Sequence, residues 1–312
     1  MKRLERKINI GISACQLGAK VRYNFKGWDM LGYLKREKEL FIWHPICPEV
    51  LSELGVPRKP IRLVGGNGDD FWDNKAIVKN SNGQQVNHEI IRGMTESLEF
   101  LKRVKADVFI YMEGSPSCGV YRTTLKNSRL GKPPGIFGSL LLKENIFLIP
   151  SSDLQSPIKW WDWRRRMYAY VWLKEQNFEK ADEIYEIWHT LKFLVQEINR
   201  QNADEIGRKL SMLKTYDFQK RNEIKKEIMD LLRKPSSTEK IKNMLWKNYK
   251  YLSKKYGLKS EKIMEPSELR NITHLAEEVL EIEKLSNLES LSFGSSPISI
   301  MNQKIKKDDQ EE

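Results

Sequence analysis

The chain has 312 residues, long enough for two domains, and 40% of them are hydrophobic and 31% charged, as in globular proteins with a highly charged surface. It holds no run of about 18 apolar residues, and the apolar run behind its charged start is too short for a signal peptide, so the sequence predicts neither a membrane-spanning helix nor a secretion signal. The chain has three cysteines, an odd number, and no secretion signal is predicted. Both observations favour a reducing compartment, so we expect the protein in the cytoplasm.

The first 150 residues alternate short apolar runs with helical periods. Ile8, Ile10 and Ile12 predict a buried strand that ends at Ser13. A crossover with an irregular helical period follows over residues 24–41. The further predicted elements are a strand over 40–46, a polar loop over 69–84, a helix over 86–104, a strand over 107–112, a loop running into a helix over 131–142 and a strand over 145–150. This order predicts an α/β fold with a parallel sheet in a domain over residues 1–150.

Each cysteine follows one of these strands or lies in a turn. Cys15 comes directly after the first strand, at the sheet edge where ligands of α/β proteins bind. Cys47 precedes a proline, and Cys118 lies in a turn rich in Gly, Ser and Pro. The long spacings fit no standard zinc or ferredoxin pattern, so spacing alone is a weak metal signal and buried structural cysteines are the alternative.

The surrounding motifs resemble a known family. SAC-x-LG-x-x-VRY at residues 13–23, CPEV at 47–50 with the following L-x-x-PR-x-P and GG, and SPSCG at 115–119 are similar to the 2-thiouracil desulfurase family over about residues 8–150. The resemblance implies a Rossmann-like enzyme that removes sulfur from a thiolated uracil. It also implies a [4Fe–4S] cluster held by Cys15, Cys47 and Cys118, with one iron left open.

Several other residues gain expected roles beside such a cluster. Glu49 is two residues from Cys47, so in an extended backbone both side chains face the same way, and we expect Glu49 to be the acid–base group. Ser117 or Ser115 is expected to position the attacking water or the pyrimidine, and the backbone N–H groups of their turn to cradle cluster sulfur or an anion. The expected substrate-binding residues are Arg22, Tyr23 and, in the proline-stiffened loop, Arg58, for which a plain surface turn is the alternative.

After Pro150 the sequence changes character. Residues 151–157 are expected to be a linker, residues 158–288 a basic all-α domain, and residues 289–312 a disordered tail. The five predicted helices span 160–174, 179–199, 203–233, 238–256 and 267–285. The cluster Trp160-Trp161-Asp162-Trp163 with Arg164-Arg165-Arg166 is expected to pack between domains. Around residues 188–193 this half is weakly similar to a helical domain that family members often carry.

The charge pattern of this half suggests an RNA partner. The formal net charge is +12 and the isoelectric point about 9.4, and residues 200–262 hold 18 Lys and Arg against 8 Asp and Glu. A basic proteome would also explain the charge. The predicted RNA-binding residues are Lys247, Lys250, Lys254 and Lys255, interleaved with Trp246, Tyr249, Tyr251 and Tyr256. The alternative is a helix with aromatic core residues and a solvated basic face.

We therefore expect [4Fe–4S]-dependent desulfurisation of a thiolated pyrimidine, either free 2-thiouracil or 2-thiouridine in tRNA, with no membrane partner. The open iron would take the substrate sulfur and polarise the thiocarbonyl carbon. Two other classes stay open. One is a tRNA-thiolating enzyme that moves sulfur in the opposite direction. The other is a non-catalytic iron–sulfur protein that binds RNA or acts as a sensor, although a sensor would not need the carboxylate of Glu49.

Overall fold

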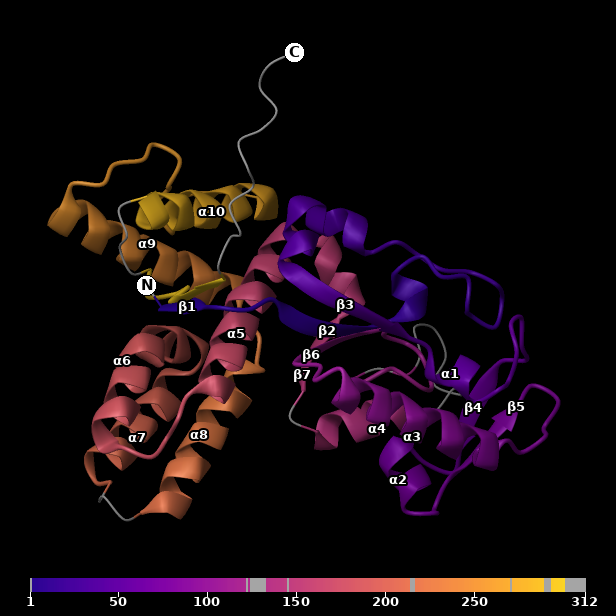
Figure 1. Cartoon of the computed structure of the whole chain (residues 1–312). Coiled ribbons are helices and arrows are strands. Elements are labelled where there is room, and N and C mark those ends of the chain that lie inside the picture. The colour runs from indigo at the N-terminus through magenta and orange to yellow at the C-terminus, as the bar shows by residue number, and fades with distance from the viewer. Residues whose placement is uncertain are drawn as a thin grey trace. The chain divides into compact units, whose positions relative to one another are not determined.

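The computed structural model of the chain (Figure 1) describes residues 2–121, 123, 133–144, 146–213, 217–269, 271–288 and 293–300. It divides into two compact units. The sheet unit is Ile8–Ser156, and the helical unit is Pro157–Glu312 together with Met1–Lys7. The first unit is α/β and the second is almost entirely helical, which confirms the predicted fold class.

Four parallel strands form the centre of the sheet unit, in the order β3-β2-β6-β7. Their bounds are β2 (Ile8–Ser13), β3 (Phe41–Ile46), β6 (Val108–Tyr111) and β7 (Phe147–Pro150). Strands β2, β6 and β7 are almost fully buried, as expected for a parallel sheet with both faces covered, whereas the edge strand β3 is partly exposed. The chain leaves β2 for β3 on one side and returns to β6 on the other. The carboxyl ends of β2 and β6 therefore flank the switch point where ligands of such sheets bind.

One face of this sheet is covered by α3 (Asn87–Arg103) and α4 (Ile136–Lys143), which lie side by side in Figure 1. Phe109 of β6 and Phe137 of α4 meet edge to face with centroids 5.6 Å apart. Gly11 of β2 allows this close packing, because a Cβ there would lie 2.6 Å from side-chain carbons of Leu101 and Phe109. The packing fixes the sheet edge that carries the site.

The connections of the sheet unit differ from the expectation at several places. The first crossover is the 3-10 segment η2 (Leu31–Leu40), which is broken at Lys35, where φ is +49°. The region expected to be a polar loop holds most of α2 (Gly68–Trp72) and all of β5 (Ile77–Asn80), which pairs in antiparallel with the earlier strand β4 (Ile61–Val64). The expected linker contains η4 (Ser151–Gln155), whose Leu154 is buried. Gly131, Lys132 and Asn145 of the predicted elements lie outside the described residues.

The helical unit is built from six described helices. They are α5 (Pro157–Glu175), α6 (Ala181–Ile198), α7 (Arg200–Ser211), α8 (Phe218–Leu232), α9 (Thr238–Tyr256) and α10 (Ile272–Leu288). The single helix expected over 203–233 is wrong, because α7 ends at Ser211 and α8 begins after Asp217. Both helices continue the apolar period, so periodicity alone does not reveal the break. None of the described helices combines the length and apolar character needed to cross a membrane.

The segment after residue 292 is ordered where it is described. Strand β8 (Ile298–Ile300) pairs in parallel with β1 (Lys2–Leu4), so that Lys2 faces Ile298 and Leu4 faces Ile300. The expected disordered tail is therefore wrong over residues 293–300, because the apolar side chains of this short stretch are buried in the unit. Residues 289–292 and 301–312 of the expected tail lie outside the described part of the chain.

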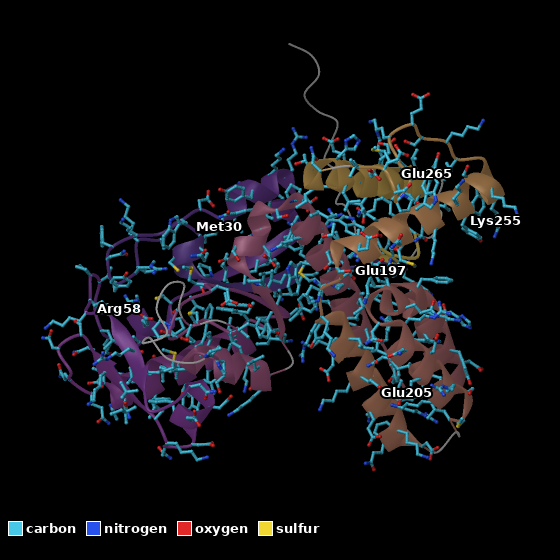
Figure 2. All side chains as sticks on the ribbon, turned by 180° about the vertical axis from the view of Figure 1, so that it is seen from behind. Met30, Arg58, Glu197, Glu205, Lys255 and Glu265 are labelled. Carbon is cyan, nitrogen blue, oxygen red and sulfur yellow. The ribbon has the colours of Figure 1, made fainter. Side chains whose placement is uncertain are left out.

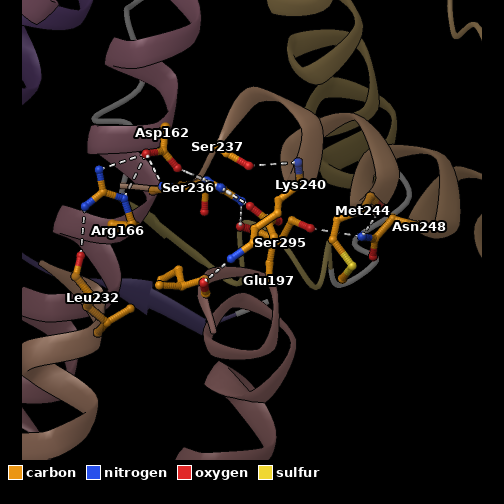
Figure 3. Close-up of polar contacts among 12 residues, drawn as sticks. Asp162, Arg166, Glu197, Leu232, Ser236, Ser237, Lys240, Met244, Asn248 and Ser295 are labelled. Carbon is orange, nitrogen blue, oxygen red and sulfur yellow. Dashed lines mark hydrogen bonds and ion pairs between the residues drawn. The ribbon is translucent and has the colours of Figure 1, made fainter. Parts of the chain in front are cut away.

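A buried network of four charged side chains joins the helices of this unit (Figure 3). Arg165 donates to Asp162 and Glu197, and Arg166 donates to Asp162 and to the carbonyl oxygen of Leu232. Two cations balance two carboxylates, which is how charges are tolerated at full burial. The expected packing between domains is wrong for Asp162, Arg165 and Arg166, because these partners all lie within the helical unit.

Candidate active site

A cavity of about 390 Å³ opens at the carboxyl edge of the sheet. It collects residues from the ends of β2, β3 and β6 and from the loop before β4. Its lining is Ser13, Ala14, Cys15, Arg22, Tyr23, Ile46, Cys47, Pro48, Glu49, Arg58, Pro60, Ile61, Met112, Glu113, Gly114, Ser115, Pro116 and Cys118. The structure thus brings all three cysteines together with Glu49, Ser115 and the three expected substrate-binding residues, although the motifs are far apart in sequence.

The cysteines are free thiols held at three element ends. Cys15 lies in the short segment η1 (Ala14–Gln16), Cys47 directly precedes α1 (Pro48–Leu51), and Cys118 lies in the turn after β6. Burial raises the pKa of Cys15, and burial together with the charge of Glu49 raises the pKa of Cys47 to about 11. Burial and the charges of the other two cysteines raise the pKa of Cys118. The three sulfurs are therefore close enough to repel one another when ionised.

This donor set suits a cationic group that keeps all three thiols ionised. Among the described residues, no three His, Cys, Asp or Glu side chains are arranged around a single metal ion. A polynuclear cluster differs from one ion because each thiolate binds a different metal atom, so its ligands are spaced more widely. Soft thiolate ligands without histidine are typical of iron–sulfur clusters. Cys15, Cys47 and Cys118 thus fit a cluster and not a single-ion site.

Glu49 is oriented by two partners. Its Oε2 accepts hydrogen bonds from Nε of Arg58 at 2.7 Å and from Nη2 of the same guanidinium, and its Oε1 accepts from the hydroxyl of Ser117. The extended backbone expected between Cys47 and Glu49 is wrong, because Pro48 begins the helix α1 and Glu49 lies in its first turn. The helix still leaves Glu49 beside Cys47 in the cavity wall.

Arg58 is almost fully occupied by protein groups. Besides its bonds to Glu49, its Nη1 donates to the carbonyl oxygen of Val21 at 2.7 Å and to that of Gly55 at 3.3 Å. Its side chain is only 4% exposed (Figure 2 labels the residue). These contacts favour a role in holding Glu49 over the direct substrate contact that the sequence suggested.

The two serines of the SPSCG turn do different things. Ser117 is fully buried and donates its hydroxyl hydrogen to Glu49. Ser115 lines the cavity, and its Oγ accepts from the backbone N–H groups of Ser117 at 3.2 Å and Cys118 at 3.1 Å. The backbone N–H groups of this turn were expected to cradle a ligand. That expectation is wrong for the N–H groups of Ser117 and Cys118, because both already donate to Oγ of Ser115.

Sequence reasoning missed two polar residues beside the sulfurs. Gln16 is buried, and its Nε2 lies 3.5 Å from Sγ of Cys15 and 3.0 Å from Sδ of Met112. The hydroxyl oxygen of Ser13 accepts from the N–H of Met112 at 3.2 Å, and Ser13 partly offsets the rise that burial causes in the pKa of Cys118. The available signal was a polar side chain directly beside a cysteine in an apolar run, where a buried polar group needs a partner.

Arg22 and Tyr23 stand at the mouth of the cavity. The guanidinium of Arg22 lies 4.7 Å from the ring centre of Trp28 and 5.6 Å from that of Tyr23. Its buried Nε has no hydrogen-bond partner among the described residues. Arg22 is therefore available to a ligand in a way that Arg58 is not.

The four lysines predicted to bind RNA are exposed on α9, and Lys255 is labelled in Figure 2. The neighbouring aromatic residues divide into two groups. Tyr251 and Tyr256 are about half exposed and lie within 5.4 Å of the Lys255 amine, whereas Trp246 and Tyr249 pack against the core of the helical unit. The exposed Tyr251 and Tyr256 thus fit the predicted RNA-binding surface, whereas Trp246 and Tyr249 fit the alternative of aromatic core residues below a solvated basic face.

Comparison with known proteins agrees with the cysteine motifs. A sequence model of the family described as 2-thiouracil desulfurase matches residues 10–153. The uncharacterised protein YbbK of Bacillus subtilis (strain 168) is 28% identical over 148 residues, which are 46% of this chain and 95% of that protein. A solved structure described as the [4Fe-4S]-dependent thiouracil desulfidase TudS is 27% identical, with a TM-score of 0.38, over 48% of this chain and 93% of that one. Residues 10–153 of the chain are thus similar to the 2-thiouracil desulfurase family, in the part that carries the three cysteine motifs.

Proposed function

We propose that this chain is an enzyme that hydrolyses a thiolated uracil to uracil and sulfide, with a [4Fe–4S] cluster bound by Cys15, Cys47 and Cys118. The observation that carries the proposal is one cavity that holds three free cysteines beside a carboxylate with fixed orientation. The match of residues 10–153 to the 2-thiouracil desulfurase family supports it. The cytoplasm is the compartment in which such thiols stay reduced.

When bound, a cluster with three cysteine ligands supplies an open Lewis-acidic iron for a soft sulfur atom. The chain's own residues supply the proton transfers. Glu49 takes a proton from water as the water attacks the thiocarbonyl carbon, and then returns it to the leaving sulfur. Hydrogen bonds from Arg58 to Oε2 and from Ser117 to Oε1 hold the carboxylate of Glu49 in place. The C=S bond is replaced by C=O, with water consumed and hydrogen sulfide released, so no oxidant or reductant is required.

The test is a sulfide assay after anaerobic reconstitution of the cluster. We expect the reconstituted chain to release sulfide from 2-thiouracil or from tRNA that contains 2-thiouridine, in equal amount to the uracil formed. The protein without its cluster is the control and should be inactive. Absence of sulfide with both substrates contradicts the proposal. Thiolation that depends on ATP and a sulfur donor identifies the opposite reaction, and cluster binding with neither activity identifies a sensor.

We propose tRNA as the physiological substrate, and α9 as one of its binding surfaces. Lys247, Lys250 and Lys254 are exposed, and none of them has a carboxylate partner in the described part of the chain. Unpaired exposed cations next to exposed tyrosines suit phosphate contacts with base stacking.

Removal of these charges should therefore reduce the salt dependence of tRNA binding. Each lost phosphate contact lowers the slope of log affinity against log salt by about 0.7–0.9, so K247A/K250A/K254A should lower it by roughly two units and weaken binding. The measurement is fluorescence anisotropy over a salt series. Lys102, Lys143 and Lys180 are exposed lysines that are already paired with carboxylates, so K102A/K143A/K180A controls for the same change of net charge. Equal slopes for the two triple variants would assign no RNA contact to α9.

A further inference from the structure

A loop of fixed backbone conformation stands at the mouth of the active-site cavity. This segment, residues 18–29, is here called the aromatic loop. At its base, the N–H of Gly18 donates to the carbonyl oxygen of Trp28 at 2.9 Å, and the N–H of Trp28 donates to that of Cys15 at 2.7 Å. On its other side, the carbonyl oxygen of Tyr23 accepts from the N–H of Arg58 at 3.2 Å. The loop is thus anchored to two residues of the candidate active site.

The aromatic loop exposes three large rings. Tyr23 is 40% exposed, Phe25 54% and Trp28 43%. Phe25 has a φ of +57°, a left-handed conformation that is unfavourable for a bulky residue and tends to persist where function or surrounding structure requires it. Of these rings, Tyr23 lines the cavity, and exposed large apolar side chains gathered on one short loop beside a cavity are typical of binding sites.

Cations lie between these rings. Arg22 lies over Tyr23 and Trp28, and the Lys20 amine lies 5.9 Å from the ring centre of Phe25. Arg22 also lines the cavity with its unpartnered Nε, and Lys26 is exposed next to Phe25. Alternating aromatic and basic side chains on a fixed backbone are the combination with which proteins bind single-stranded nucleic acid.

We propose that the aromatic loop binds the nucleotides that flank the thiolated uracil in a single-stranded RNA segment. Phe25 and Trp28 stack on the flanking bases, Lys20 and Lys26 contact their phosphates, and Arg22 contacts the target nucleotide at the cavity mouth. A uracil within RNA reaches the cavity only after it leaves the stack of its neighbours, and the exposed rings replace the stacking that is lost. A free base has no neighbours or phosphates, so the loop favours RNA as the substrate. This inference rests on the proposed function.

The binding test uses the full chain with its cluster and a fluorescein-labelled single-stranded RNA that contains one 2-thiouridine. Stacking contributes enough per base that F25A and W28A should each weaken binding by roughly 5- to 30-fold. F25Y and W28F keep a ring and should bind nearly as well as the unaltered protein. Tyr33 is 56% exposed but lies outside the aromatic loop, so Y33A is the matched control and should not change the affinity. RNA binding by F25A and W28A that equals that of Y33A overturns the proposal.

A second measurement does not depend on the folding of any variant or on turnover. RNA with 5-iodouridine next to the 2-thiouridine is cross-linked to the unaltered protein by light, and the modified peptides are identified by mass spectrometry. Adducts on residues 20–28 are expected. Adducts confined to the helical unit overturn the proposal even if sulfide is released. Adducts on the loop without sulfide release from any substrate contradict the proposed function and leave the loop as an RNA-binding site.

Discussion

Replacement of Cys15, Cys47 or Cys118 by alanine is expected to abolish cluster binding. Each variant leaves two thiolates in the cavity, too few to hold a cluster that the chain binds with three. The broad visible absorption of a cysteine-ligated cluster should disappear, and iron and acid-labile sulfide should fall to the level of the unreconstituted protein. These three quantities are measured after anaerobic reconstitution, with circular dichroism to establish that each variant is folded.

Met112 provides a control in the same cavity. Its sulfur is a thioether that accepts a hydrogen bond from Gln16, and M112L changes the volume little. We expect M112L to load iron as the unaltered chain does. Full iron loading in any one of the three cysteine variants would show that the corresponding cysteine is not a ligand.

Glu49→Gln is expected to keep the cluster and to lose most turnover. General acid–base groups contribute about 10²- to 10⁴-fold to rates, so kcat should fall by that order. The amide keeps the shape of the carboxylate, still accepts from Arg58, and can donate to Ser117 if that hydroxyl turns round. It does not exchange a proton near neutral pH. The measurement is the rate of sulfide release at matched iron content.

Glu53 offers the same chemical change four residues away. Its side chain is 75% exposed and paired with Arg92, so E53Q should behave as the unaltered protein. Loss of the cluster in E49Q would make Glu49 a ligand or a structural residue. Normal turnover in E49Q would transfer the acid–base role to Ser117 or to a bound water.

The cysteine site was largely predictable because its geometry follows from strand ends. Ile8, Ile10 and Ile12 predict a buried strand from the local sequence alone. In a parallel sheet, the carboxyl end of this strand then places Cys15 at the same edge as the turn that carries Cys118. The short apolar runs of β6 and β7 were recognisable for the same reason. Helix α9 was also predicted with its bounds, because Ser237 and Gly257 are clear start and stop signals.

The rest depends on contacts between residues that are distant in sequence. Arg58 was expected to contact the substrate. Folding instead brings Glu49 next to Arg58, and the guanidinium donates its hydrogen bonds to that carboxylate. The run of three arginines was expected to pack between domains, but Arg165 is buried against Asp162 of its own helix and Glu197 of another. Strand β8 is three residues long and has no periodic signal, so its pairing with β1 could not be seen locally.

The pairing of β1 with β8 also determines where the chain can be cut or joined to replace one of the two units. Residues 2–4 belong to the helical unit, so the chain enters the sheet unit at Ile8 and leaves it at Ser156. In topology the sheet unit is an insertion within the helical one. A chimaera that keeps the helical unit intact must therefore graft a foreign domain between Lys7 and Pro157, at two junctions. After a single protease cut before Pro157, the fragment that carries the cysteines still has a strand hydrogen-bonded into the other fragment.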